Sequence, residues 1–432
     1  MLMLLAAARP AAGAADPKIT IDYIDEMQAE IEALRGLEYR EPVDAKFVEQ
    51  EEIAGVAHEI MLREGMDRDF IHAAARVMEA FGFLDSAEGL EDALDAVLTQ
   101  QVEGLYDTDN NVLYVVRETL LSKEAQQLLR AMGGINPRDF ALSHELEHAL
   151  QAQHFDLTLL GSMRRNNEDA ALAYKCVVEG DAMAVMMNYS MRDAGANVLD
   201  IPGMGAQMQD MMNMPGGAAP GSFPDVPEVI KAQFTFPYTG GLDFLGALYR
   251  DGGWGSVNRA FENPPLSTEQ IMHPEKYMVA PDDPVGLDLT AVAALVPHGS
   301  TLLDNNVLGE FQVRLLLDLG HPDMDKTALE QAAAGWDGDR YAAYQAPAGH
   351  TILFWAAAWD TPADAHEFFS AHSAVLTHRF GEPVESGTGG ETVRWNTPCG
   401  PAVLALKHDR TALAHCADPD TVAQTTEALL AA

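Results

Sequence analysis

Two histidines spaced four residues apart carry the most recognisable chemistry in this chain. They belong to His144-Glu145-Leu146-Glu147-His148, an H-E-x-x-H pattern inside a stretch that favours a helix. Positions four apart share a helix face, so both imidazoles would lie one turn apart on the same side. Glu145 would lie about 100° round the axis, close enough to touch a water on a metal without being a ligand. Two nitrogen ligands, an open position and a base are what zinc needs to activate water.

The residues around the motif make a chance match on a solvated helix the poorer interpretation. Small and apolar side chains flank both histidines: Ala141, Leu142, Leu146, Ala149 and Leu150. A helix that places a Glu and two His among apolar neighbours must give their polar atoms a partner. We therefore expect this segment to bind zinc.

Zinc requires one more protein ligand, and two residues compete for that role. Glu179 lies on the next long helical stretch, where a carboxylate would complete a His₂Glu set. His154 matches the metzincin spacing H-E-x-x-H-x-x-G-x-x-H, in which a Gly lets the helix end and the last His turn back. Gln151 occupies the Gly position here, in a run with good helix propensity. A continuous helix would hold His154 about 9 Å along the axis from His148, so we favour Glu179.

The surroundings of Glu179 support this choice. Its helical stretch from Ala171 to Val185 is mostly apolar, so a Glu there needs a partner. An ordinary surface acid, or a pair with Lys175 one turn away, is the alternative. Gly180 would let two helices approach closely, whereas Asp181 points to nearly the opposite face and is a poor ligand.

A series of helices and one hairpin surrounds these residues. A strand just before the motif helix would offer its edge to an extended peptide. Two β-prone runs on either side of an Asp/Asn turn predict such a hairpin over Gly104–Val116. Apolar spacing predicts helices over the following ranges: Ile19–Leu34, Ala45–Arg63, Asp69–Phe81, Glu88–Val102, Ser122–Ala131, the motif segment and Asn166–Ser190.

The rest of the chain divides into a loop-rich stretch and a strand-rich end. Pro202–Pro227 is rich in Gly, Met and Pro and predicts a loop, and Phe236–Gly241 precedes a helix that reaches Tyr249. Ser267 with Gln270 is a capping-box pattern for a short helix ending at Pro274. From about His350, strands and helices follow: Thr351–Trp359, Pro362–Phe380, Thr392–Asn396, a hairpin between Cys399 and Cys416, and Pro419–Leu430.

Composition narrows the class of protein. The chain has 432 residues, 47% of them hydrophobic, which suffices for two packed units. Its 27 basic and 66 acidic residues give a net charge of −39, which would repel nucleic acid and anionic membranes. No segment approaches the roughly 20 apolar residues of a membrane span, so we expect no stable membrane insertion.

Two features predict export, to the medium, the periplasm or the cell envelope. Residues 1–15 hold a short apolar run followed by small residues, similar to a signal peptide without its positive n-region. Cys399 and Cys416 flank a predicted hairpin that would bring them together, and a disulfide there suits an oxidising compartment. Cys176 is then unpaired and is expected in the core.

The segments His144–Leu157 and Val178–Ala182 resemble the gluzincin clan of zinc metallopeptidases. They are more closely similar to a poorly characterised group of exported bacterial metallopeptidase-like proteins. Gly104–Asp107, Phe236–Tyr238 and Ser267–Pro274 belong to the same pattern, so the resemblance covers about residues 80–280.

The resemblance implies His144, His148 and Glu179 as the Zn²⁺ ligands and Glu145 as the general base. Met183 stands where the clan places a second acid, so the resemblance does not name the group that orients the two imidazoles. Two acids near the motif, Glu147 and Asp156, are candidate partners for the histidines.

These observations together predict an α+β protein. Residues 17–300 would form a mainly helical, zincin-like metallopeptidase domain with a small edge hairpin, divided into a helical prelude (17–100) and a catalytic core (101–280). A connecting segment (301–348) would lead to a small C-terminal α+β domain (349–432).

The predicted reaction is hydrolysis of a peptide bond in a peptide or protein substrate by zinc-activated water, with Glu145 as base. The oxyanion needs a further donor. His273, which ends a short capped helix, is the first candidate, followed by Tyr238 and Tyr106. The alternative is a zinc-stabilised, catalytically degenerate peptidase-like scaffold that binds proteins in the cell envelope. A third interpretation is a zinc hydrolase of non-peptide amides or esters.

Overall fold

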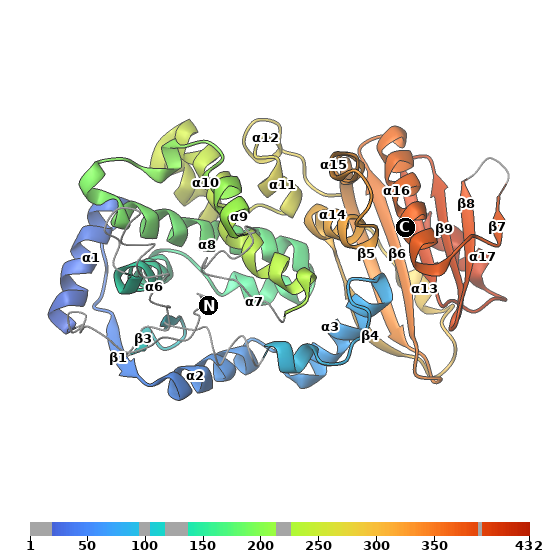
Figure 1. Cartoon of the computed structure of the whole chain (residues 1–432), viewed down its shortest axis with the longest axis horizontal. Coiled ribbons are helices and arrows are strands. Elements are labelled where there is room, and N and C mark those ends of the chain that lie inside the picture. The colour runs from blue at the N-terminus through green and yellow to red at the C-terminus, as the bar shows by residue number, and fades with distance from the viewer. Residues whose placement is uncertain (1–19, 95–103, 117–136, 213–225, 388–390) are drawn as a thin grey trace. The chain divides into compact units, whose positions relative to one another are not determined.

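The computed structural model describes residues 20–94, 104–116, 137–212, 226–387 and 391–432 (Figure 1). The predicted leader and the predicted helix over Ser122–Ala131 lie outside these residues. The described protein is α+β, as expected, and divides into two compact units. The first comprises Met1–Asp67, Glu91–Gly161 and Ala173–Pro265, and the second Arg68–Leu90, Ser162–Leu172 and Leu266–Ala432. None of the described helices is long and apolar enough to cross a membrane.

Helices make up most of the first unit. They are α1 (Ile21–Arg35), α2 (Gln50–Arg63), α6 (Pro137–His154), α8 (Glu168–Ser190, in this unit from Ala173), α9 (Met204–Met212) and α10 (Glu228–Glu262), with the short turns η1 (Arg192–Ala194) and η2 (Val198–Asp200). α7 (Leu159–Arg164) crosses the boundary between the two units along the chain. The predicted helices at the motif and over Asn166–Ser190 are therefore present as α6 and α8.

A three-stranded sheet in the order β1-β3-β2 completes the first unit. β2 (Gly104–Asp107) and β3 (Val112–Val116) form the predicted antiparallel hairpin, with β2 at the edge and in contact with α6. The prediction of a helix from Ala45 was wrong at its start, because Asp44–Val48 forms β1 and pairs in parallel with β3. A capping box between Glu49 and Glu52 then begins α2.

The core of this unit holds α6 in place. Met27 and Ile31 of α1, Leu146 and Leu150 of α6 and Val185 of α8 belong to one buried cluster. Burial of these apolar side chains favours packing of the three helices against the small sheet. The motif helix is thus fixed by its own apolar residues.

Two expectations for residues 202–249 differ from the structure. α9 occupies part of the predicted loop Pro202–Pro227, while residues 213–225 are not described. α10 begins at Glu228 and continues through Pro237, although the helix was expected to follow Phe236–Gly241. The chain departs from helical geometry later, at Gly252 and Gly253, which have the conformational freedom to form a kink.

The second unit is built on a seven-stranded sheet whose neighbouring strands are all antiparallel. In spatial order the strands are β4 (Thr301–Asn306), β5 (Trp336–Gln345), β6 (Thr351–Trp359), β10 (Arg410–His415), β9 (Gly400–Lys407), β8 (Thr392–Thr397) and β7 (Glu385–Ser386). Its helices are α3 (Arg68–Phe81), α11 (Thr268–Met272), α12 (Glu275–Met278), α13 (Thr290–Ala293), α14 (Gly309–Gly320), α15 (Lys326–Ala333), α16 (Pro362–Phe380) and α17 (Val422–Leu429).

The predicted connecting segment 301–348 differs from the structure, since it contains β4, β5, α14 and α15. β4 and β5 pair with each other, and β5 pairs with β6, so this segment is part of the sheet. The predicted strand Thr351–Trp359 and helix Pro362–Phe380 match β6 and α16 at both ends.

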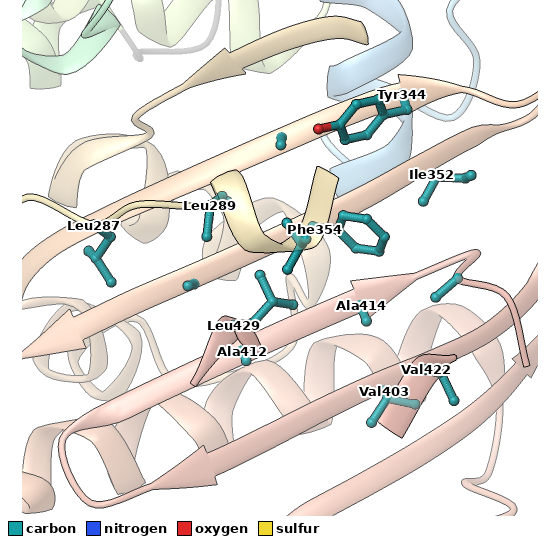
Figure 2. Close-up of a cluster of buried hydrophobic side chains, with 14 of the residues drawn as sticks. Leu287, Leu289, Tyr344, Ile352, Phe354, Val403, Ala412, Ala414, Val422 and Leu429 are labelled. Atoms are coloured by element: carbon teal, nitrogen blue, oxygen red, sulfur yellow. The ribbon is translucent and has the colours of Figure 1, made fainter. Parts of the chain in front are cut away.

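Both faces of the sheet are covered. Figure 2 shows Ile352 and Phe354 of β6 on one face, in a buried cluster with Leu289 and with Leu429 of α17. On the other face, the ring of Trp359 stacks on Phe368 of α16 with centroids 4.3 Å apart. A strand that is buried on both faces needs apolar residues at successive positions, which explains the continuous apolar sequence of β6.

The cysteine predictions agree with the structure. Cys399 and Cys416 lie at the ends of β9 and β10 and form a disulfide, with their Cα atoms 5.2 Å apart. Cys176 is buried on α8 and is not part of this disulfide.

Candidate metal centre

Three side chains of the first unit converge on one point, as the sequence predicted. His144 and His148 extend from α6, and Glu179 from α8, and all three are fully buried. The Nε2 atoms of the two imidazoles are 2.9 Å apart. Glu179 Oε2 lies 3.2 Å from the Nε2 of His144 and 3.5 Å from that of His148.

These distances suit a tetrahedral metal ion. With metal–ligand bonds of roughly 2.0–2.2 Å, neighbouring ligand atoms of a tetrahedron lie about 3.3 Å apart. The three separations of 2.9, 3.2 and 3.5 Å bracket that value. Two imidazole nitrogens and one carboxylate oxygen are also a donor set that zinc accepts, leaving one position open. The residues present therefore fit the ion that the motif implies.

A close approach of two helices positions Glu179. The next residue, Gly180, packs directly on the backbone of α10, where a Cβ would lie only 2.4 Å from the carbonyl carbon of Gly241. The sequence-based expectation that Gly180 permits close helix packing is confirmed. α10 thereby brings Tyr238 to the site, with its ring centroid 5.9 Å from that of His144.

The edge strand β2 positions Glu145. The backbone N–H of Tyr106 donates a hydrogen bond of 2.9 Å to Glu145 Oε2. Gly104, two residues earlier, leaves room for the carboxylate, because a Cβ there would lie 3.0 Å from Glu145 Cγ. Glu145 Oε1 has no hydrogen-bond partner within the described part of the chain. One carboxylate oxygen is therefore anchored and the other remains available for a small molecule.

Burial governs the pKa values of these groups. Desolvation lowers the pKa of His144, which favours the neutral imidazole that binds metals. Desolvation raises the pKa of Glu145 to about 7. For Glu179, desolvation acts upward, but hydrogen bonds with both histidines outweigh it and hold the pKa well below its usual range. Desolvation, followed by the charges of Glu179 and Glu145, raises the pKa of Tyr238 and keeps its hydroxyl protonated.

The other predicted donors make contacts of their own. The Tyr106 hydroxyl donates to Asn111 Oδ1 at 2.8 Å. His273 belongs to the second unit, at the end of α11, where its Nε2 lies 2.9 Å from Glu310 Oε1. The hydrogen bond with Glu310 raises the pKa of His273. Among the three predicted oxyanion donors, the structure brings the Tyr238 side chain together with the predicted metal ligands.

The rival ligand His154 is not part of this cluster. α6 continues to His154, and its imidazole Nε2 donates to the backbone carbonyl of Glu38 at 2.8 Å. Of the two acids predicted as histidine partners, Asp156 instead accepts hydrogen bonds from Thr158. Glu147 Oε1 lies 3.6 Å from Arg35 Nε.

Sequence reasoning missed a buried polar network behind the predicted metal ligands. Gln151 lies between His148 and Asp181, and Asp181 is paired with Arg35 at 2.8 Å, with the charged groups fully buried. Desolvation, followed by the charge of Asp181, raises the pKa of Glu147 well above its usual range. The available signal was Arg35, the single basic residue at the end of a helix that otherwise carries acidic residues, together with Gln151 where a metzincin has Gly.

Residues 300–426 match a family described as a domain of unknown function (DUF8575). This range covers the seven-stranded sheet of the second unit and does not include the metal centre. No curated protein matches the chain. A solved structure titled "Crystal structure of a putative hydrolase with a novel fold from Chloroflexus aurantiacus" is similar at 18% sequence identity and a TM-score of 0.36, over 59% of this chain and 86% of that chain.

Proposed function

We propose that this protein is a zinc-dependent hydrolase that cleaves peptide bonds. The observation that carries the proposal is the convergence of His144, His148 and Glu179 on one point, with Glu145 beside them. A structural zinc site is normally closed by four protein ligands, whereas three ligands, an open position and an adjacent carboxylate are typical of hydrolytic sites.

The residues of the site would have separate roles in this reaction. Zinc held by the three ligands would lower the pKa of a bound water to about 7 and polarise the scissile carbonyl. Glu145 would accept a proton from the attacking water through Oε1 and then deliver it to the leaving amine. The hydrogen bond from Tyr106 to Oε2 would keep the carboxylate in a fixed orientation throughout.

The oxyanion of the tetrahedral intermediate requires a hydrogen-bond donor. Tyr238 is the donor that the structure supports best, because it belongs to the same unit as the ligands and its ring lies 5.9 Å from His144. His273 stays a prediction, since its imidazole is hydrogen-bonded to Glu310 in the second unit.

Export of the protein is part of the proposal. The disulfide between Cys399 and Cys416 supports it, because such bonds persist in oxidising compartments. A peptide or protein outside the cytoplasm is accordingly the substrate class that we propose.

The test compares the wild type with Glu145→Gln. Zinc content is measured by elemental analysis, and turnover with a fluorescently labelled, unfolded protein. Glu145→Gln keeps the shape of the side chain but cannot accept a proton, so we expect one zinc per chain and turnover reduced by about 10²–10⁴. His154→Ala is a matched control on the same helix, and both zinc and turnover should be unchanged.

Each contrary outcome is informative. Equal activity of Glu145→Gln would exclude the general-base mechanism. Zinc in a wild type that hydrolyses neither peptides nor small amides and esters would favour a zinc-stabilised binding scaffold. Loss of zinc in His154→Ala but not in Glu179→Ala would show that the ligand set is wrong.

A further inference from the structure

Gln151 links the metal centre to the buried ion pair behind it. It lies on α6, less than one turn after His148, and is fully buried. Its Oε1 lies 2.9 Å from His148 Nδ1. Its Nε2 lies 2.9 Å from the backbone carbonyl oxygen of Val178 and 3.1 Å from Asp181 Oδ2.

These contacts fix which end of the amide faces the histidine. A carbonyl oxygen and a carboxylate oxygen can only accept hydrogen bonds, so both must be met by the NH₂ group of Gln151. Its carbonyl oxygen is left to face His148, and that oxygen can only accept. His148 Nδ1 must therefore carry a proton, and its Nε2, which is directed at the point shared with His144 and Glu179, is the atom that would offer its lone pair to a metal.

Asp181 is itself held by a cation. Arg35 Nε donates to both carboxylate oxygens of Asp181, at 2.8 and 3.1 Å. The same guanidinium donates through Nη2 to Asn258 Oδ1 at 2.7 Å and lies 4.3 Å from the ring centroid of Trp254. Residues of α1 and α10 thus fix the position of Asp181, and Asp181 fixes the amide of Gln151.

We propose that Gln151, anchored by Asp181 and Arg35, is a positioning residue that holds His148 in the tautomer and orientation required for metal binding. The inference rests on the proposed zinc function. It also supplies what the sequence left open, since Met183 stands where a second acid would be expected to orient a histidine. The groups that orient ligating histidines typically change metal affinity by about 10–100-fold when removed.

The test uses the full-length protein and the variant Gln151→Met, which keeps the length of the side chain and removes its hydrogen bonds. Gln153→Met is the matched control, because Gln153 lies on the same helix and bonds the backbone of Arg40 and Glu41 rather than the site. Zn²⁺ affinity is measured by competition with a chromophoric chelator. We expect binding about 10–100-fold weaker in Gln151→Met and unchanged in Gln153→Met.

A second measurement reads the tautomer directly. Long-range ¹H–¹⁵N spectra of the histidine rings in metal-free protein should show His148 protonated at Nδ1 in the wild type, and a mixture of tautomers in Gln151→Met. Because this arm needs no metal, it separates the two proposals. A wild type that binds no zinc but shows the Nδ1–H tautomer overturns the zinc function and leaves the positioning role intact.

Asp181→Asn keeps the side-chain volume and serves if Gln151→Met does not fold. The substitution turns one of the two acceptor oxygens into an NH₂ donor, which would face the Gln151 NH₂ or the Arg35 Nε–H, and it removes the negative charge opposite Arg35. We therefore expect weaker zinc binding and a smaller share of the Nδ1–H tautomer. Wild-type affinity and an unchanged tautomer in the variants that fold would overturn the inference.

Discussion

Replacing Gly180 by Ala should open the metal centre without touching a ligand. A Cβ at this position would lie 2.4 Å from the carbonyl carbon, 2.6 Å from the carbonyl oxygen and 2.9 Å from the Cα of Gly241. All three are backbone atoms of α10 and cannot rotate away. The contact is reciprocal, because a Cβ on Gly241 would lie 2.1 Å from the carbonyl oxygen of Cys176.

The size of the effect follows from these distances. Ordinary contact of a Cβ begins at 3.4 Å, so the shortfall at 2.4 Å requires α8 and α10 to separate by 1.0 Å. Overpacking costs about 1–3 kcal/mol, and we expect the upper end because backbone must move. The Ala itself would recover up to about 1 kcal/mol of helix propensity, which leaves a net loss of about 2 kcal/mol. Glu179 on α8 and Tyr238 on α10 would move apart. Turnover should fall about 10²-fold, as expected when a residue of the site is displaced by about 1 Å.

The assay pairs Gly180→Ala with Gly55→Ala. Gly55 is an exposed residue of α2, and a Cβ added there would meet no other atom within 4 Å. The same substitution at Gly55 should therefore stabilise the protein by about 0.5–1 kcal/mol. Urea unfolding gives both stabilities, and elemental analysis gives zinc. Wild-type stability, zinc and turnover in Gly180→Ala would refute the packing argument.

Two further predictions concern the second unit. Burial lowers the pKa of His372 to about 3 and that of His415 to about 4, against about 6.5 in the unfolded chain. Stability should therefore be complete above about pH 6.5 and fall as the pH drops towards 4, by up to about 1.4 kcal/mol per unit for each imidazole. Urea unfolding midpoints measured across this pH range should show this slope. The slope should be smaller in His372→Leu and unchanged in His366→Leu, because His366 is exposed on the same helix. Reduction of the Cys399–Cys416 disulfide should cost about 3 kcal/mol, and an unchanged urea midpoint under a reductant would contradict this.

Local patterns in the sequence were sufficient to predict which residues come together in much of the candidate metal centre. Spacing on one helix predicted the pair His144 and His148, and an isolated acid in an apolar run predicted Glu179. Gly180 beside it predicted the close packing that the structure contains. Each of these inferences depends on residues near one another in the chain, where helical periodicity decides which side chains share a face.

What could not be predicted depends on partners distant in sequence. Asp44–Val48 has helical neighbours, yet it forms β1 because Val112–Val116 offers it a strand to pair with. Likewise, β4 and β5 become strands by pairing with each other and with β6. The role of Gln151 needs Asp181 and Arg35, which three separate segments bring together.

The distribution of buried charge gives an independent reason to expect a divalent cation at the metal centre. The part of α8 in the first unit carries two buried acids, Glu179 and Asp181, which are two residues apart and so face different sides of the helix. Asp181, on one side, has Arg35 as its counter-charge. On the other side lies Glu179, and Glu145 of α6 is close to the same ligands. Among the described residues neither forms an ion pair with a Lys or Arg, and Glu179 faces the two imidazoles. Two buried carboxylates without a cation are costly, and a doubly charged ion between neutral imidazoles would balance both.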